Sequence, residues 1–363
     1  MYLHKINITN FKNISKAELE FSPKINCISG NNGCGKTNLL DAVYYLSMTK
    51  SFFNVSDLYN ISFGEKCASI NGIYNRSDGT QEKISIGIGD EKIIKKNGKA
   101  YSKKSDHIGL IPIVMVSPAD TALVNESGEE RRRFMNFILS QIDKVYLNKI
   151  QNYNQLLLQR NKLLKTPDFS KDLLDIISER MCISAAYIYE KRVSLCNNLK
   201  IYLKDYYNKL SGGREEIDIK YVSDLDKGPL ENLFKSSYER DILFKYTTVG
   251  IQRDDMSFLI NGYPIKKIGS QGQQKSFLIS LKLAQFSLMK EVEKKLPILL
   301  LDDVFDKLDF QRVEYLLSLV SGDMFGQIFI TDSNKVRINK ILESASAESK
   351  CFSVVDGNYS VVD

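Results

Sequence analysis

Several residue types that commonly carry chemistry are scarce in this sequence. Its 363 residues include no tryptophan, only two histidines, and six cysteines that form no C-x-x-C pair. Zinc fingers bind their metal through closely spaced cysteine and histidine pairs, so this class is excluded, and the wide cysteine spacing favours reduced thiols. Because His4 and His107 are the only histidines, we do not expect catalysis by a histidine base.

Long apolar runs and a large excess of one charge are also missing. The longest apolar runs, residues 111–116 and 296–301, are far shorter than the roughly 20 residues of a membrane-spanning helix. The N-terminus has no apolar stretch of the kind that secretory signals contain, so we expect a cytoplasmic protein. Fifty Lys and Arg against 44 Asp and Glu give a net charge of +6, which suits an anionic partner without identifying one.

Strand-like alternation of apolar and polar residues dominates the first third of the chain. It begins within residues 1–30 and returns over residues 68–105, where Asp78-Gly79 and Asn97-Gly98 suit tight hairpin turns. This pattern predicts an antiparallel side sheet.

Helical periodicity replaces this alternation over residues 127–210, which contain almost no glycine beyond the first turn. Two short apolar runs near the C-terminus, residues 298–301 and 327–331, are typical of buried strands in a parallel sheet. The sequence therefore predicts an α/β domain with a mainly helical insertion. The expected boundaries are 1–125 and 236–363 for the α/β domain and 126–235 for the insertion.

Residues 30–37, GNNGCGKT, match the pattern G-x-x-x-x-G-K-[ST] at every fixed position. They lie between a predicted strand and a predicted helix, where this pattern binds phosphate. Glycines let backbone N–H groups curl around a phosphate, Lys36 reaches the terminal phosphates of a nucleotide, and Thr37 offers a hydroxyl to Mg²⁺. We therefore predict a site for ATP and Mg²⁺. The residues expected to contact ATP are Gly30, Asn31, Asn32, Gly33, Cys34, Gly35, Lys36, Thr37 and Asn38.

Two adjacent acids end a predicted buried strand much later in the chain, where LLL at residues 299–301 is followed by Asp302 and Asp303. A carboxylate at the C-terminal end of such a strand can hold Mg²⁺, and its neighbour can polarise a water that attacks a phosphate in line. We assign Asp302, together with Thr37, to the metal. Asp303 is the predicted catalytic residue, which orients the water.

A polar segment, SQGQQK at residues 270–275, precedes an apolar helix and the two acids. Its serine can cap that helix, and the N–H groups exposed at a helix N-terminus can bind phosphate. The phosphate loop, the helical insertion, this segment, and LLLDD followed by Leu308-Asp309 together resemble the head of an ABC-type ATPase of the SMC and DNA-repair branch.

Within that branch the sequence is similar to the RecF family over nearly its whole length. Motifs in the order of the family are Asn10-Phe11-Lys12-Asn13, Ser117-Pro118 with Asp120, Arg131-Arg132-Arg133-Phe134, Gln159-Arg160-Asn161, Gly250 with Arg253-Asp254-Asp255, and residues 270–275. The resemblance implies an α/β fold, namely an ABC-type P-loop ATPase head with an antiparallel side sheet and an inserted helical lobe.

The resemblance also implies a mechanism. In the family, ATP closes a homodimer in which the signature segment of one subunit meets the nucleotide held by Lys36 of the other. The closed dimer grips duplex DNA at single-strand gaps, hydrolyses ATP slowly, and helps RecO and RecR to load the RecA recombinase. We expect the same of this chain, as a weak, DNA-dependent ATPase associated with the nucleoid. The residues implied are Ser270, Gln271, Gly272 and Gln273 for the signature and Asp309 for the D-loop.

Direct signs of DNA binding are two groups of basic residues, on the hairpin around Asn97-Gly98 and at residues 131–133. Such residues contact the phosphate backbone and do not read bases. A solvated lysine hairpin, and ion pairs of the arginines with acids such as Glu129 and Glu130, are alternatives. The candidate DNA contacts are Lys95, Lys96, Lys99, Arg131 and Arg132.

Two other protein classes share part of this pattern. A transporter nucleotide-binding subunit has the same fold, but residues 270–273 contain no Leu-Ser-Gly-Gly core and Thr331 lies where a switch histidine is expected. A P-loop kinase shares only the phosphate loop and does not need the adjacent acids. Both classes stay as alternatives to an ATP-driven DNA-repair protein.

Overall fold

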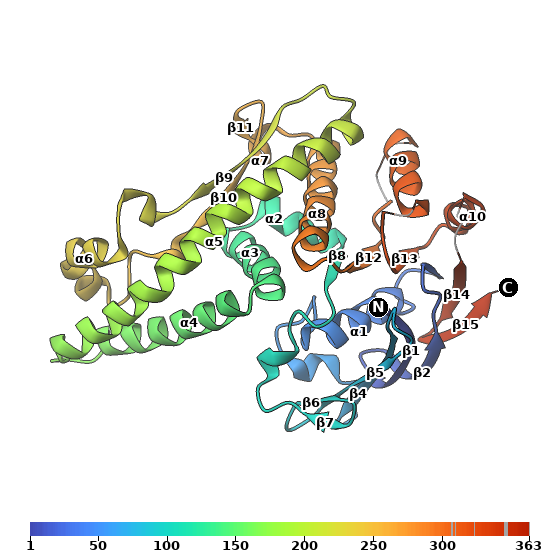
Figure 1. Ribbon diagram of the computed structural model, residues 1–363, viewed down its shortest axis with the longest axis horizontal. Coiled ribbons are helices and arrows are strands. Elements are labelled where there is room, and N and C mark those ends of the chain that lie inside the picture. Colours follow the sequence, from blue (N-terminus) through green and yellow to red (C-terminus); the bar gives the residue numbers. More distant parts are fainter. Residues whose placement is uncertain (306–307, 309, 323, 345–347, 363) are drawn as a thin grey trace. The chain divides into compact units, whose positions relative to one another are not determined.

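The chain folds into two compact units in the computed structural model (Figure 1), which describes residues 1–305, 308, 310–322, 324–344 and 348–362. Unit 1 consists of Met1–Asp120 and Gln285–Asp363, and unit 2 consists of Thr121–Ala284. Among the described residues, no helix combines the length and the apolar character needed to cross a membrane.

Unit 1 contains an antiparallel sheet of six strands in the order β2-β1-β4-β5-β6-β7. Asn97 and Gly98 form the turn between the last two strands with positive φ angles of 49° and 81°, which Asn and Gly adopt most readily. The predicted side sheet is therefore confirmed. Its strands are β1 (Tyr2–Phe11), β2 (Ile14–Glu20), β4 (Ala68–Asn75), β5 (Gln81–Ile88), β6 (Ile93–Lys96) and β7 (Lys99–Ala100).

A second sheet in unit 1 has the order β15-β14-β3-β13-β12-β8. Adjacent strands in this sheet are parallel, except that β14 and β15 form an antiparallel hairpin with each other. Strands β3, β8, β12 and β13 are buried along their whole length, as continuous apolar runs predict. The strands are β3 (Ile25–Ser29), β8 (Ile113–Val116), β12 (Ile298–Asp302), β13 (Ile328–Asp332), β14 (Ser349–Val355) and β15 (Asn358–Val362).

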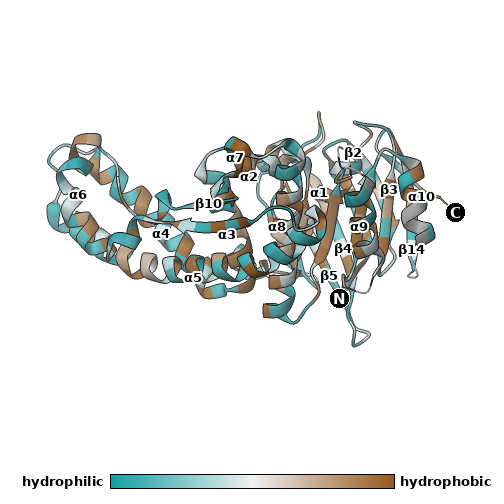
Figure 2. Ribbon diagram, turned by 90° about the horizontal axis from the view of Figure 1, so that it is seen from above, coloured by the Kyte–Doolittle hydropathy of each residue, from teal (hydrophilic) through white to brown (hydrophobic). Residues whose placement is uncertain are grey.

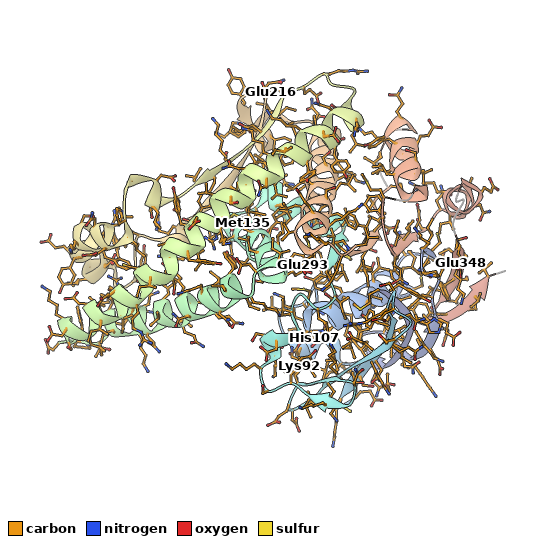
Figure 3. The ribbon with its side chains drawn as sticks, viewed as in Figure 1. Lys92, His107, Met135, Glu216, Glu293 and Glu348 are labelled. Carbon is orange, nitrogen blue, oxygen red and sulfur yellow. The ribbon has the colours of Figure 1, made fainter. Side chains whose placement is uncertain are left out.

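Helix α1 (Lys36–Met48) contacts both sheets of unit 1, touching β1, β4 and β5 of one and β8, β12 and β13 of the other. Nε2 of the buried His107 lies 2.7 Å from the carbonyl oxygen of Leu46, and Nζ of Lys92 donates to the carbonyl oxygen of Thr49 over 2.8 Å (Figure 3). Both side chains therefore satisfy carbonyl groups at the C-terminal end of α1. The other helices of the unit are η1 (Asp57–Asn60), η2 (Lys104–His107), α9 (Phe310–Ser321) and α10 (Lys335–Ser344), and η3 (Pro118–Thr121) ends at its boundary.

Unit 2 is mainly helical, with a small antiparallel sheet in the order β11-β10-β9. Asp143 and Ser170 cap the helices α4 and α5, because their side chains accept hydrogen bonds from the N–H groups of Tyr146 and Leu173. Hydrophobic and hydrophilic residues alternate along these helices in Figure 2, as expected where one face is buried. The elements are α2 (Ala122–Asn125), α3 (Gly128–Ile142), α4 (Lys144–Leu164), α5 (Lys171–Ser211), β9 (Ile217–Val222), η4 (Asp224–Lys227), α6 (Leu230–Phe244), η5 (Ile251–Arg253), β10 (Asp255–Ile260), β11 (Tyr263–Pro264), α7 (Ile265–Ile268) and the first part of α8 (Gln271–Glu293).

Two buried ion pairs hold unit 2 together. Arg160 on α4 bonds to Asp241 on α6 over 2.7 Å, and Arg192 on α5 bonds to Asp254 over 2.6 Å. Each of these four side chains is almost fully buried, so removal of one partner would leave an unpaired charge in the core. Arg160 and Asp254 belong to family motifs, and both have a structural role here.

The division between the units differs from the expected domain boundaries. The two units meet between residues 120 and 121 and between residues 284 and 285. The sequence instead predicts domain boundaries between 125 and 126 and between 235 and 236. Residues 236–284 join the helical unit because β10 pairs with β9, packs on α3, and follows the Asp254 that bonds to Arg192. Strand patterns in this segment indicated a return to the α/β domain, although these strands form a separate sheet.

Candidate functional site

The phosphate loop, residues 30–37, connects the buried strand β3 to α1. Gly33 and Gly35 have φ angles of 81° and 116°, a region that glycine adopts without a steric penalty. In the described part of the chain, the backbone N–H groups of Gly33, Gly35, Lys36 and Thr37 have no hydrogen-bond partner. The loop therefore presents several unpaired donors at a helix N-terminus, the arrangement that binds phosphate.

Lys36 is buried within this loop. Its Nζ donates hydrogen bonds to the carbonyl oxygens of Gly30, over 2.8 Å, and of Asn31, over 3.0 Å. These bonds fix the ammonium group across the loop, where a nucleotide phosphate would add a stronger, charge-assisted partner. The predicted position of Lys36 among the phosphate-binding groups is consistent with this geometry.

Thr37 and Asp302 meet, although they lie far apart in the sequence. The Thr37 hydroxyl donates to Oδ1 of Asp302 over 2.8 Å, and the Thr331 hydroxyl donates to the same oxygen over 2.7 Å. Asp302 ends β12, and β13 separates this strand from β3. Burial raises the pKa of the Asp302 carboxyl above its ordinary value, although both hydrogen bonds favour the ionised form.

The residues at this point fit Mg²⁺. This ion prefers oxygen ligands and commonly takes one or two from the protein, completing its shell with water and phosphate oxygens. The oxygens of Thr37 and Asp302 lie 2.8 Å apart, close to the spacing of about 2.9 Å between neighbouring ligands of an octahedral ion at about 2.0–2.1 Å. A bound cation would also offset the cost of burying the Asp302 carboxylate.

Asp303 follows Asp302 in a left-handed conformation, with φ at 45°. Its N–H donates to the hydroxyl of Thr331 over 3.1 Å, so Thr331 contacts both acids. The Asp303 side chain is half-buried, and its carboxylate has no hydrogen-bond partner among the described residues. It is thus able to accept a hydrogen bond from a water molecule.

A third acid, Asp332, was not identified from the sequence. It ends β13, beside β12, and is buried; burial raises the pKa of its carboxyl. Nε of Arg337 lies 3.0 Å from one of its oxygens. The rule that pointed to Asp302, an acid directly after a buried apolar strand, applies equally to this position and could have found it.

The signature segment begins α8 in unit 2. The N–H of Ser270 donates to Oε1 of Gln273 over 2.7 Å, and the N–H of Gln273 donates to the Ser270 hydroxyl over 3.2 Å. This reciprocal pair is a capping box. The side-chain amide of Gln273 donates to Glu215, which also accepts a hydrogen bond from the hydroxyl of Tyr207 over 2.5 Å. Glu215 and Tyr207 were not identified from the sequence, where nothing in their spacing marks them.

The basic candidates for DNA contact fall into two groups. Lys95 and Lys99, on β6 and β7, are exposed and have no ion-pair partner in the described part of the chain, whereas Lys96 pairs with Glu82 over 2.9 Å. Arg131 and Arg132 are turned into unit 2. Arg131 forms a two-point ion pair with Asp255, and Arg132 donates to the carbonyl oxygen of Asp254. Arg131 and Arg132 therefore have structural partners other than the expected acids. Arg133 does pair with the expected Glu130, over 2.9 Å, and Glu129, over 3.5 Å.

The remaining predicted site residues have varied surroundings. Asn31 and Asn32 are exposed at the tip of the phosphate loop, and Cys34 is buried beneath it. Nδ2 of Asn38 donates to Oδ1 of Asn13 over 2.7 Å. Asp309, the expected D-loop residue, lies outside the described residues.

Comparison with known proteins places this chain among relatives of similar length. A family model described as the RecF/RecN/SMC N terminal domain matches residues 2–349. DNA replication and repair protein RecF of Bacteroides fragilis is 44% identical over 360 residues, which cover 98% of this chain and 97% of that protein. The protein of the same name from Flavobacterium johnsoniae is 42% identical over 359 residues, which cover 98% of this chain and 100% of that protein.

Solved structures support the fold. The recombination mediator protein RecF bound to ATP, in the RecFOR pathway, superposes with a TM-score of 0.89 at 31% identity, covering 100% of this chain and 98% of that one. The Smc head domain of Pyrococcus furiosus has a TM-score of 0.58 at 16% identity, over 99% and 96% of the two chains, a likeness of fold alone. The predicted ABC-type ATPase head is confirmed.

Proposed function

This chain belongs to the RecF family of DNA replication and repair proteins, ABC-type ATPases that bind ATP, and from this membership we propose that ATP closes it into a homodimer that holds DNA. The observation that carries the proposal is the phosphate loop with its Thr37–Asp302 hydrogen bond in unit 1. A capped helix N-terminus at the signature of unit 2 supports it.

Within one subunit, the unpaired N–H groups of the phosphate loop and the ammonium of Lys36 bind the phosphates of ATP. Thr37 and Asp302 hold Mg²⁺, which supplies charge neutralisation at the phosphates when it is bound. Asp303 accepts a hydrogen bond from the attacking water and orients it. Because its backbone is anchored to Thr331, which also contacts Asp302, the two acids keep a fixed relation.

The signature of the second subunit completes the site. The Ser270 hydroxyl oxygen accepts the N–H of Gln273, which leaves its own O–H free to donate to a phosphate oxygen. Exposed N–H groups at the start of α8 add positive potential there. A two-fold dimer satisfies both nucleotides at once, so ATP drives association and hydrolysis reverses it.

DNA lies against the dimer through backbone phosphates. Lys95 and Lys99 are the residues of this chain that support such contacts best, since both are exposed and unpaired in the described part of the structure. By family membership, the substrate is gapped duplex DNA, the partners are RecO and RecR, the outcome is RecA loading, and DNA stimulates ATP hydrolysis. The site of action is the nucleoid in the cytoplasm.

Sedimentation tests these claims together. Wild-type protein with ATP and Mg²⁺ is expected to sediment as a dimer, and gapped duplex DNA is expected to co-sediment with that dimer at moderate salt. Lys36→Ala should remain a monomer, whereas Lys16→Ala, an exposed lysine of the same unit, should behave as wild type. A wild-type protein that stays monomeric with saturating ATP, or a dimer that fails to bind DNA, would contradict the proposal.

A further inference from the structure

The C-terminal hairpin of β14 and β15 touches the phosphate loop through residues outside every motif that marks the ATP site. We infer that this hairpin, through Gly357 and Tyr359, sets the direction of the loop N–H groups that bind the phosphates of ATP. The inference rests on the proposed function and adds two positioning residues to it. Its support is a set of contacts within unit 1.

Two hydrogen bonds connect the hairpin to consecutive carbonyl groups of the loop. The N–H of Gly357 donates to the carbonyl oxygen of Cys34 over 2.9 Å, and the hydroxyl of Tyr359 donates to that of Gly35, also over 2.9 Å. The Gly35 carbonyl accepts a second bond from Leu39 in the first turn of α1. For the Cys34 carbonyl, Gly357 is the partner that the described structure provides.

These two bonds also determine the direction of the N–H groups that follow the two carbonyls. In a trans peptide the C=O of one residue and the N–H of the next point in opposite directions. When the Cys34 carbonyl is held by the hairpin, the Gly35 N–H points away from it, and the Gly35 carbonyl fixes the Lys36 N–H in the same way. Both of these N–H groups are among the unpaired donors of the loop.

Without such anchors the Cys34–Gly35 peptide would be free to rotate, and the Gly35 carbonyl would be held by the Leu39 N–H alone. Gly33 and Gly35 have positive φ angles, and glycine adopts many other conformations at little cost. If these glycines became ordered only when ATP binds, the affinity for ATP would be lower, because binding would include the loss of their conformational entropy. The hairpin orders the loop before the nucleotide arrives.

Close packing keeps the hairpin against the loop. A Cβ atom on Gly30 would lie 2.6 Å from the carbonyl oxygen of Val354, and one on Gly357 would lie 2.5 Å from that of Asn13. Both distances are too short for any side chain, so glycine is required where the loop meets the hairpin at Val354 and where the hairpin meets Asn13, between β1 and β2. Burial raises the pKa of the Tyr359 hydroxyl, which therefore remains a protonated donor at physiological pH.

The test removes one hydroxyl and measures nucleotide affinity. Tyr359→Phe keeps the ring and deletes the bond to Gly35. Tyr74→Phe is the matched control, because its hydroxyl is buried in the same unit and has no hydrogen-bond partner among the residues that the structure describes. Affinity for ATP with Mg²⁺ is measured by calorimetry, and thermal melting follows the nucleotide-free proteins. We expect Tyr359→Phe to bind ATP about 3- to 10-fold more weakly, with a melting temperature that matches the control.

A second variant acts on the other bond. Gly357→Ala forces a Cβ against the carbonyl oxygen of Asn13 at a φ of 77°, which should disturb the Gly357 N–H bond to Cys34 and lower ATP affinity by about 10-fold or more. If this variant does not fold, Tyr359→Phe decides alone. In steady-state hydrolysis, KM for ATP should rise while kcat changes little, since the acids are untouched.

The outcomes separate this inference from the proposed function. If wild-type protein binds ATP and Lys36→Ala does not, but Tyr359→Phe binds as tightly as wild type, the inference is overturned and the function stands. A loss of affinity accompanied by an equal loss of nucleotide-free stability, beyond that of Tyr74→Phe, also overturns it, because the hydroxyl would then act on folding. Failure of the wild type itself to bind ATP would overturn the proposed function.

Discussion

The side-chain amide of Gln273 donates a hydrogen bond of 2.7 Å to a carboxylate oxygen of Glu215. This bond joins the signature at the start of α8 to the segment between α5 and β9. The side-chain oxygen and the backbone N–H of Gln273 form the capping box with Ser270. Glu215 therefore holds a side chain that itself bonds to the serine. The acid thus contacts the signature without belonging to it.

Glu215→Ala should weaken ATP-driven dimerisation about 3- to 10-fold, because the signature loses one fixed hydrogen bond. ATP affinity of the monomer should not change, since the phosphate loop is untouched. The matched control is Glu216→Ala, the next residue, whose exposed side chain forms a 3.4 Å ion pair with Lys204. Sedimentation equilibrium over a range of protein concentrations checks this. Equal dimerisation of both variants would show that Glu215 has no role in the signature.

Asp303→Asn should slow ATP hydrolysis by about 10²-fold or more while leaving ATP binding intact, because an amide keeps the shape but does not polarise water. Asparagine tolerates the left-handed backbone found at this position, so the variant should fold. The ATP-bound dimer should then persist. Single-turnover hydrolysis and sedimentation measure the two effects, with the exposed Asp90→Asn as control. Normal hydrolysis by the variant would assign the water to another group, and Asp332 would be the next candidate.

The core of the ATP site was predictable because its chemistry is local. A glycine loop between strand and helix, and acids directly after an apolar strand, are each visible within ten residues of sequence. The meeting of Thr37 with Asp302 follows once β3, β13 and β12 are neighbours in a parallel sheet. The functional roles given to these residues remain predictions that the variants above test.

There is a physical reason why the sequence did not predict the supporting residues. Glu215, Gly357 and Tyr359 act on segments that are distant in sequence, and two of their contacts are made to or from the backbone, which leaves no residue pattern. The expected domain boundaries likewise differ from the division into units. Strand periodicity at residues 255–260 is visible, but it does not say which sheet the strand joins, and β10 pairs with β9 in unit 2.

Stability of unit 2 should depend on pH through Asp143. Burial opposes ionisation of this carboxyl, but hydrogen bonds from Tyr146, Tyr187 and Lys191 outweigh it and hold its pKa below the ordinary value. A lowered pKa in the folded state adds stability at pH values above the ordinary pKa. This stability is lost as the pH falls from the ordinary pKa through the lower pKa of the folded state.

Asp143→Ala should therefore lower the free energy of unfolding by about 1 kcal/mol at pH 7, as loss of a helix N-cap does, and by less at pH 3. Urea denaturation at both pH values measures this, with the exposed Asp172→Ala as control. The same loss at pH 7 and pH 3 would show that the ionised form contributes nothing.

The proposed ATP site, shared between two subunits, gives the last prediction. Ser270→Arg places a bulky cation at the N-terminus of α8, where it opposes the helix dipole and blocks the approach of the other subunit's phosphate. Monomer affinity for ATP should survive, because residues 30–37 are untouched, whereas dimerisation and ATP-dependent DNA binding should fail. Loss of monomer ATP affinity in this variant would contradict a signature that acts across the interface.

Mixing Ser270→Arg with Lys36→Ala sharpens this test. In the mixed dimer, one site combines both defects, and the other joins an intact phosphate loop to an intact signature. ATP hydrolysis should therefore partly recover as one variant is titrated into the other, provided that one sound site suffices to close the pair. The control mixes Lys36→Ala with the double variant Lys36→Ala/Ser270→Arg, in which no pairing yields a sound site, and no recovery is expected. No recovery in the test mixture would contradict a site that is shared between subunits, and recovery in the control would show that the recovery does not depend on Lys36.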